Sequence, residues 1–504
     1  MNPNIDQVLK ALGEALKMPL PDELVKAWVQ AGSPTSGITA YDLEAPAKHL
    51  FPVLTPLRNE IPRVGGGVGT AVNWRAVTGI NTNNMEAGVS EGNRGGVIAH
   101  TTADYTAAYK GIGLEDNVTF EAEYAGNTFD DVKALAVMGL LNALMIQEEI
   151  LLLGGDNSLA LGTTPTPAAA GAITGGSLAA ATYSVICVAL TMNGVNSGSV
   201  AGGIRAAVSR TNADGSTDNY GGGSAQKSAA VSATVASGSA GSISATVAPV
   251  SGAAGYAWFW GAAGAEVLGA ITSLNSILIT ANATGTQTAT SLPSSDNSRN
   301  TLAFDGILTQ CYAPGSGALI LTQPSGTAGT GTPLTSDNFG GIVEFDQVLK
   351  DRWDNFRLSP DTIWVASQEQ QYIQGKILGT NASNAAQRFV FNVSQNKIMG
   401  GTLALSYLNK FGVVGQGAEY GQGKEIPIRI HPFMPAGTIL FTSKSLPYKL
   451  NNVANVIQVK TRRDYYQLEW PLRTRKYEYG VYSDEVLQNY FPPAFAVIRN
   501  VGKG

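Results

Sequence analysis

Charged side chains are scarce in this chain of 504 residues: Asp, Glu, Lys and Arg together make up 14%. The two cysteines, Cys187 and Cys311, lie far apart in the sequence, and the three histidines, His49, His100 and His431, have no metal-ligand spacing. We therefore predict no disulfide framework, no bound metal and no cofactor. The net charge of -5 argues against a protein whose main work is to neutralise nucleic-acid phosphates.

A continuous apolar run is missing from the amino-terminal region, where acidic residues recur, so we expect no export signal. Residues 132–153 are long and apolar enough to cross a bilayer, but Lys133, Glu148 and Glu149 interrupt them. A charge at bilayer depth costs a few kcal/mol. The sequence therefore predicts a long helix packed on protein, and no membrane partner.

Catalytic motifs are also lacking. Residues 88–92 match GxSxG, but glycine and asparagine flank them where a nucleophile elbow needs a strand before the serine and a helix after it. Residues 421–424 (GQGK) suggest a phosphate loop, yet Glu425 stands where Ser or Thr would bind magnesium. We predict that the protein is not an enzyme and has no catalytic residue.

What the sequence does contain begins with an arm and a loop. Apolar residues at three- and four-residue spacing predict amphipathic helices over 5–17 and 22–31. From 64 to 100 glycine and asparagine punctuate short strands, which predicts a long two-stranded excursion with too few large apolar groups for its own core. A helix over 127–154, capped by Asn127 or Thr128, follows.

Between about 160 and 300 the charged residues nearly vanish, and the hydrophobic period becomes two. Several short strands separated by Gly, Ser and Asn turns are typical of a β-sandwich. The stretches GYAWFWGAAG and LNSILITA resemble the later strands of immunoglobulin-like modules. We predict an inserted all-β domain here.

The rest of the chain returns to a mixed pattern. Asp337 precedes a predicted helix that runs through Trp353, residues 362–366 form a buried strand, and Ser367 caps a helix to Leu378. The last eighty residues alternate as long antiparallel strands and end in an apolar strand over 494–501.

Five stretches outside the insert carry a resemblance to a known family. They are LFPVLTPLRNEIPRVGG, FDDVKALAVMGLLNALMIQEEILLLGG, LAFDGILTQ, PDTIWVASQEQQYIQGKI and KYEYGVYSDEVLQNYFPPAFAVIRNV. In their order along the chain they resemble the major capsid protein fold of tailed double-stranded DNA phages, the Hong Kong type.

Together with the all-β insert predicted above, the resemblance implies an α+β fold in five parts. These are an N-terminal arm (1–62), an extended loop (63–112), a peripheral domain with a spine helix (113–160 and 439–504), an inserted immunoglobulin-like sandwich (161–300) and an axial domain (301–438).

The resemblance also implies a structural role. Pentamers and hexamers of the chain would assemble through loop and arm exchange into an icosahedral shell around double-stranded DNA, bound without sequence specificity. The shell would form in the host cytoplasm with a separate scaffolding protein, a portal and possible decoration proteins. No lysine lies between Arg58 and Tyr109, so we predict a shell held non-covalently.

Candidate inter-subunit contacts are charged residues of the loop and of the terminal strands: Arg75, Glu91, Arg94, Arg462, Arg463, Arg473 and Arg475. The basic cluster near 460–476 fits a solvated face or ion pairs with a neighbouring subunit, and contact with packaged DNA is the other interpretation. The insert would decorate or stabilise the outer surface. An alternative function is a surface adhesin or carbohydrate-binding protein built around the immunoglobulin-like domain.

Overall fold

The computed structural model describes residues 50–81, 88–126, 131–212, 214–292, 294–338, 340–378, 406–411, 423–448 and 451–503. The helices predicted over 5–17 and 22–31 lie outside the described residues, as do Asn127 and Thr128. The chain divides into two units: residues 1–51 with 119–135, and residues 52–118 with 136–504.

The described part of the first unit is short. It contains α4 (Phe120–Gly126) and the start of α5 (Val132–Gly154), and Lys133 Nζ lies 2.6 Å from Glu123 Oε1. Helix α5 begins five residues later than predicted. Asp131 Oδ1 accepts a hydrogen bond from the Ala134 amide at 3.1 Å, so the aspartate caps the helix.

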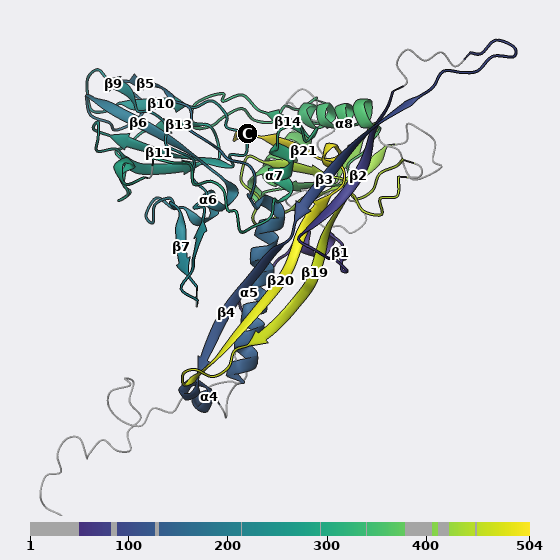
Figure 1. Cartoon of the computed structure of the whole chain (residues 1–504). Coiled ribbons are helices and arrows are strands. Elements are labelled where there is room, and N and C mark those ends of the chain that lie inside the picture. Colours follow the sequence, from purple (N-terminus) through teal and green to yellow (C-terminus); the bar gives the residue numbers. More distant parts are fainter. Residues whose placement is uncertain are drawn as a thin grey trace, which may run out of the picture. The chain divides into compact units, whose positions relative to one another are not determined.

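A four-stranded sheet in the order β1-β19-β20-β4 runs alongside α5 in the second unit (Figure 1). Its strands are β1 (Arg63–Val64), β19 (Ile457–Glu469), β20 (Lys476–Asn489) and β4 (Lys110–Thr119). Leu140 and Leu144 of α5 pack between Ile112 and Val481 of the sheet. The spine helix predicted from the sequence thus has one face that packs against the four-stranded sheet.

A six-stranded sheet, in the order β14-β21-β18-β15-β17-β16, forms the next part of this unit. Its strands are β14 (Leu319–Thr322), β21 (Ala496–Arg499), β18 (Ile439–Thr442), β15 (Thr362–Val365), β17 (Lys424–Ile430) and β16 (Ser406–Asn409). Strands β18 and β21 come from beyond residue 438, so the sheet crosses the boundary predicted between the axial and peripheral domains.

Three helices accompany this sheet: α7 (Ile307–Tyr312), α8 (Val343–Phe356) and α9 (Ser367–Leu378). Phe345 of α8 packs edge-on against Phe441 of β18, with ring centroids 5.2 Å apart. Helix α9 has its predicted extent. Helix α8 begins six residues after Asp337, because the carboxylate of Asp337 instead accepts from the Gly341 amide at 2.6 Å in the preceding loop.

The segment predicted as an insert forms two facing sheets, in the orders β13-β10-β5 and β12-β11-β6-β9. Their strands are β5 (Ala168–Ala172), β6 (Ala181–Leu190), β9 (Val231–Val235), β10 (Ser242–Thr246), β11 (Gly255–Gly261), β12 (Val267–Thr272) and β13 (Ser276–Ile279). The segment also contains α6 (Met192–Ser197) and the hairpin of β7 (Val208–Thr211) and β8 (Thr217–Tyr220). Its relation to immunoglobulin domains stays a prediction.

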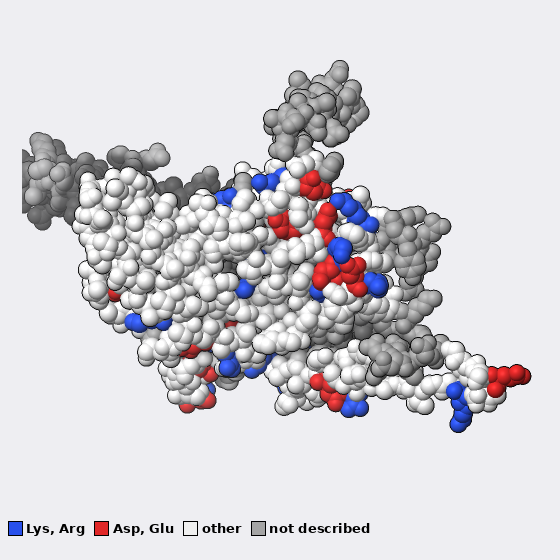
Figure 2. Space-filling model, turned by 90° about the horizontal axis from the view of Figure 1, so that it is seen from above, with Lys and Arg blue, Asp and Glu red and all other residues white. Residues whose placement is uncertain are grey.

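The core of the insert lies between its two sheets and includes Val185, Ile243 and Trp258. The indole of Trp258 donates to Thr272 Oγ1 at 2.9 Å, and that of Trp260 donates to the Ala281 carbonyl at 3.0 Å. Both tryptophans are therefore core residues. The face of the insert that is seen in Figure 2 carries few charged side chains and forms a broad white area.

The two ends of the insert meet in the second unit. The Asn300 amide donates to the Asp156 carbonyl at 2.6 Å, and Arg299 Nε donates to the Asn157 carbonyl at 2.9 Å. Arg499 of β21 reaches the insert, where Nη1 donates to the Val250 carbonyl at 2.8 Å. The insert is therefore joined to the rest of the unit by two adjacent segments, residues 156–157 and 299–300, which we call the neck. It also contacts the six-stranded sheet through Arg499.

Because its two ends lie side by side at the neck, the insert can be removed to test whether the rest of the chain folds without it. Replacing residues 159–298 by Gly-Ser-Gly should leave a soluble protein with the six-stranded sheet intact, because the backbone bond at the neck survives. We expect a cooperative thermal transition and a circular dichroism spectrum with less strand content. Aggregation of the shortened chain, with a soluble full-length control, would show that the insert is needed for folding.

Candidate functional site

The extended loop is a two-stranded hairpin of β2 (Ala71–Asn81) and β3 (Ala99–Ala108) that pairs with no further strand in the described part of the chain. At its base the Trp74 ring stacks on Tyr105 and meets Tyr490 edge-on, each at 5.7 Å between centroids. Farther out the apolar side chains are uncovered: Val77 is 64% exposed and Ile80 is 55% exposed. The two-stranded excursion without its own core is confirmed.

The connection between these strands is equally open. Val97 in this connection is 93% exposed, and residues 88–98 form no helix or strand. The GxSxG match at 88–92 falls here, without a flanking strand or helix among the described neighbours, so it is a loop as predicted.

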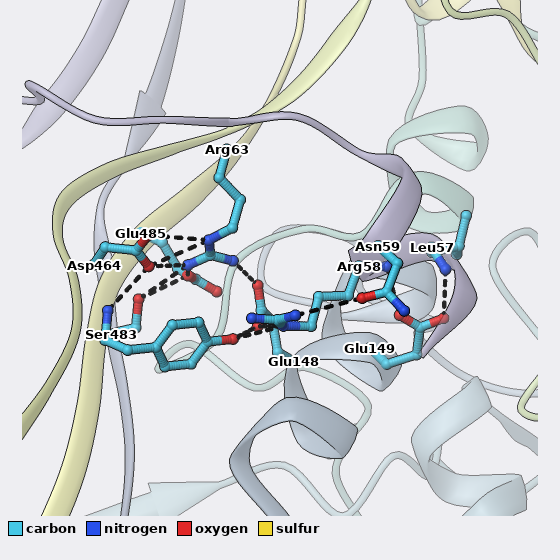
Figure 3. Close-up of polar contacts among 10 residues, drawn as sticks. Leu57, Arg58, Asn59, Arg63, Glu148, Glu149, Asp464, Ser483 and Glu485 are labelled. Atoms are coloured by element: carbon cyan, nitrogen blue, oxygen red, sulfur yellow. Dashed lines mark hydrogen bonds and ion pairs between the residues drawn. The ribbon is translucent and has the colours of Figure 1, made fainter. Parts of the chain in front are cut away.

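A buried charged cluster lies where the chain enters this hairpin. Strand β1 carries Arg63, whose Nη2 lies 2.7 Å from Glu485 Oε2 and 2.6 Å from Asp464 Oδ1. Its Nη1 also contacts Glu148 of α5 (Figure 3). One guanidinium therefore joins three carboxyl groups from three elements.

A second arginine reaches the same helix from α3 (Pro56–Glu60). Arg58 Nε donates to Glu148 Oε2 at 3.0 Å and to the Tyr465 hydroxyl at 2.9 Å. The Tyr465 hydroxyl contacts Glu148, and its ring lies 5.0 Å and 4.8 Å from the guanidinium carbons of Arg58 and Arg63. The Tyr465 ring thus makes cation–π contacts with both guanidinium groups.

The neighbouring carboxylate, Glu149, has different partners. Its oxygens accept from the backbone amides of Leu57 at 2.8 Å and Arg58 at 2.7 Å, which have no partner within the short helix α3. His431 Nε2 lies 2.6 Å away, and because His431 Nδ1 accepts from the Phe433 amide at 3.2 Å, Nε2 carries the proton. Glu149 therefore fastens α3 and the segment after β17 to the spine helix.

Burial has a clear electrostatic effect in this cluster. Loss of water, together with the nearby Glu485 carboxylate, raises the pKa of Glu148 to about 7, although Arg63 and Arg58 oppose the shift. At the neck of the insert, burial and the nearby Asp305 carboxylate raise the pKa of Asp156 to about 7. Burial is thus the main cause of the raised pKa at both of these carboxyl groups.

The loop residues predicted as inter-subunit contacts have different surroundings. Arg75 pairs with Asp104 across the hairpin, with Nε 2.6 Å from Oδ1. Glu91 and Arg94 are exposed in the connection and form no ion pair with a described residue. Whether they contact a second subunit stays a prediction.

The residues of β19 and the following turn that were predicted as inter-subunit contacts also have different surroundings. Arg462 Nη1 donates to the Gly69 carbonyl at 3.0 Å, and Arg463 lies over the Tyr466 ring at 3.9 Å. Arg473 and Arg475 are exposed in the turn between β19 and β20. The structure does not bring the seven predicted residues together into one site.

In the sequence the charges of Glu148 and Glu149 argue against a membrane helix, but they do not by themselves reveal the buried cluster. Helix α5 does have the length and composition of a membrane span, and it is the one such helix in the described ranges. Two adjacent acidic residues near the end of an apolar helix were the available signal, since buried charges in proteins require partners. Those partners lie far away in the sequence.

Comparisons with known proteins were made at the level of sequence and of structure. No protein-family model matches the sequence, and no curated protein matches it. Among solved structures, the chain is similar to the capsid of a native GTA particle, with 8% identity, a TM-score of 0.42, and 92% of this chain and 96% of that chain covered.

Two further solved structures are also similar to the chain. The capsid of Myoviridae phage XM1 has 10% identity and a TM-score of 0.40, with 92% of this chain and 99% of that chain covered. The holo-SrpI encapsulin complex from Synechococcus elongatus PCC 7942 has 8% identity and a TM-score of 0.39, with 92% and 93% covered.

Proposed function

We propose that this protein is the structural subunit of a phage-type capsid, and that copies of it assemble into a closed icosahedral shell of pentamers and hexamers. The observation that carries the proposal is the β2–β3 hairpin. Its outer half exposes Val77, Ile80 and Val97 and has no covering element in the described chain. A lone two-stranded hairpin is marginally stable in water, so its apolar side chains call for another surface.

A second copy of the same chain is the partner we propose for the hairpin. Each subunit would then give one hairpin and receive one, which is a head-to-tail contact, and such a contact generates a ring when its rotation closes. Once the first contact forms, the others act at high effective concentration, so modest contacts add up to a stable particle.

The interior of the shell would hold double-stranded DNA without sequence specificity. The net charge of -5 favours a container over a DNA clamp. Part of the basic cluster is already used within the chain, since Lys460 Nζ donates to the Gly65 carbonyl at 2.8 Å and Arg462 pairs with Asp484. We place the protein in the virion capsid, assembled in the host cytoplasm, with a separate scaffolding protein, a portal and possible decoration proteins.

The role proposed is structural and not enzymatic, and the shell is held without covalent cross-links by loop lysines, because residues 59–108 contain none. The insert would decorate or stabilise the particle. The adhesin or carbohydrate-binding alternative gains no support from Trp258 and Trp260, whose rings are buried and whose indole groups donate within the core.

Particle size tests the proposal directly. The purified full-length protein should form closed shells, or rings of five or six subunits, as its concentration rises. Light scattering gives the mass and negative-stain electron microscopy gives the shape. A monodisperse monomer at every concentration, with or without a co-expressed scaffolding protein, would overturn the proposal.

A further inference from the structure

A cavity of about 70 Å³ lies among α3, α7, β15, β18 and the start of β19. Its wall is largely apolar and includes Leu57, Ile307 and Ile457. Pro62 and Lys444, which also line it, are exposed, so the cavity opens to solvent. An engineered protein cavity of about 150 Å³ holds benzene. A cavity of half that volume is suited to an aliphatic side chain and not to an aromatic ring.

The wall of the cavity also contains a hydrogen-bond donor that lacks an acceptor. The Trp364 side chain of β15 lines the cavity and is fully buried, and its Nε1 has no hydrogen-bond partner among the described residues. A buried donor without a partner is costly, so an acceptor is expected there. The charged wall residues Glu60 and Lys444 pair with each other, with 3.3 Å between Oε1 and Nζ. The cavity therefore suits an uncharged ligand with an aliphatic group and a hydrogen-bond acceptor.

An exposed apolar segment precedes α3 in the sequence. This arm segment, residues 50–54 (LFPVL), has no charged residue, and it includes Leu50, 89% exposed, and Leu54, 58% exposed. None of its carbonyl groups accepts a hydrogen bond from a described residue. Pro52 and Pro56 disfavour a helical backbone at the residues before them, and residues 50–55 form no helix or strand. The arm segment is thus an extended peptide with free aliphatic side chains and free acceptors.

We propose that the cavity beside Trp364 binds the arm segment of a second copy of the chain. The Leu50 side chain of the second copy fills the cavity, and a neighbouring carbonyl of that copy accepts a hydrogen bond from Trp364 Nε1. Extended peptides that contain proline are recognised in this manner, through apolar pockets and side-chain donors. The inference rests on the proposed function, since it names the surface on which one subunit receives the arm of another.

The size of the arm segment favours a second copy of the chain as its source. Four partly exposed apolar side chains offer on the order of 300 Å² of apolar surface. A stable interface takes about 800 Å² from each partner, so this contact is too small to hold two molecules together alone. The β2–β3 hairpin follows α3 after only the short strand β1, and its uncovered side chains are also proposed to meet another copy. The arm contact therefore adds to the contact of the hairpin.

A peptide of residues 48–56 (KHLFPVLTP), labelled at its amino terminus, tests the cavity by fluorescence anisotropy. The receptor is the full-length protein with Leu50→Ser, Phe51→Ser and Leu54→Ser, so that its own arms do not compete. We expect a dissociation constant of roughly 10 μM to 1 mM, because the contact is small. The same peptide with Leu50→Ser should bind at least about tenfold more weakly. If the natural peptide does not bind, or if both peptides bind equally, the inference is wrong.

Variants of the receptor locate the peptide. Asn455→Trp narrows the cavity at its wall and should abolish binding. Trp364→Phe keeps a ring but removes the donor, and it should weaken binding by roughly threefold to tenfold. The exposed change Asp354→Asn on α8 should have no effect. Should Trp364→Phe fail to fold, Asn455→Trp decides the matter, and unchanged binding to it counts against the cavity.

Two further measurements identify the hydrogen bond and the occupant. In nuclear magnetic resonance spectra of the ¹⁵N-labelled receptor, the indole proton of Trp364, assigned by its loss in Trp364→Phe, should move downfield as peptide is added. An unmoved signal contradicts the proposed hydrogen bond. A peptide of residues 94–100 (RGGVIAH) carries the exposed Val97 of the hairpin connection. Tighter binding of this peptide than of the arm peptide would reassign the cavity to the hairpin.

The arm contact and the capsid role can fail separately. Peptide binding with the expected pattern, in a natural protein that never forms particles, would keep the cavity as an arm-binding site and remove the capsid role. Normal particles from the natural protein, with no binding of the peptide, would keep the capsid role and remove the arm contact.

Discussion

Replacing residues 79–100 by Asn-Gly is expected to give a folded, soluble subunit that no longer forms closed particles. The change joins Thr78 to Thr101 through a tight turn and keeps the paired base of the hairpin, including Trp74 and its contacts with Tyr105 and Tyr490. It removes the outer half, where Ile80 and Val97 are exposed. Size-exclusion chromatography with light scattering, followed by negative-stain microscopy, measures the outcome.

The magnitude follows from the apolar surface that a neighbour would cover. Burying two or three such side chains contributes roughly 3–4 kcal/mol per subunit. Every 1.4 kcal/mol is about tenfold in an association constant, and each subunit of a closed shell repeats the loss. We therefore expect the concentration needed for assembly to rise by at least about a hundredfold.

A matched control is available on the insert. The β7–β8 hairpin is also two-stranded, and replacing residues 212–216 at its turn by Asn-Gly shortens a loop that contains no large apolar residue. Particles should form normally from that control. Normal particles from the shortened β2–β3 hairpin would show that the loop is not an assembly element.

Substitution of Glu149 by alanine is expected to have the largest effect on stability of any single change in the cluster. The side chain is buried, and its removal leaves the amides of Leu57 and Arg58 and the His431 ring without an acceptor. Breaking a buried charged network on one side costs about 3–5 kcal/mol. Urea unfolding followed by tryptophan fluorescence should show this decrease in the free energy of unfolding.

An exposed acidic residue provides the comparison. Asp354→Ala removes the surface pair between Lys350 Nζ and Asp354 Oδ2, at 2.8 Å, and should change the free energy of unfolding by less than about 1 kcal/mol. A similarly small change for Glu149→Ala would mean that the network does not hold α3 to the spine helix.

The hairpin could be predicted from the sequence because its signals are local. Glycine and asparagine punctuate the strands, and large apolar residues are too sparse for a separate core. The same holds for α9 and β15, whose extents follow from Ser367 and from the apolar run at 362–365. A pattern of this kind fixes an element without reference to its partners.

Strand pairing could not be predicted in the same way. Leu319 pairs with Ala496, and Val365 pairs with Ile439. The hydrophobic periodicity of a strand does not indicate which strand it pairs with. The predicted boundary at 438 follows from the family resemblance, whereas the sheet is joined by strand pairing across it. The strand order is a property of the packed core and not of any one segment.

The candidate site shows the same limit for side chains. Arg75 was singled out because it is a charge in an exposed loop, and its partner, Asp104, lies within that loop. The residues that fasten the hairpin's root are charges in apolar surroundings, and Arg58 contacts Glu148 across 90 residues of sequence. Charge patterns along the chain do not reveal such contacts, because burial decides them.

The position of β21 in the six-stranded sheet has a consequence during synthesis. This strand lies between β14 and β18, so the sheet stays in two pieces until residues 496–499 have left the ribosome. Pairings this distant in sequence form slowly. By then the β2–β3 hairpin, made some four hundred residues earlier, has long been exposed. Several chains that are translated from one messenger RNA would therefore expose their β2–β3 hairpins before the rest of each subunit has folded. Nascent chains of this protein should therefore need protection from premature association.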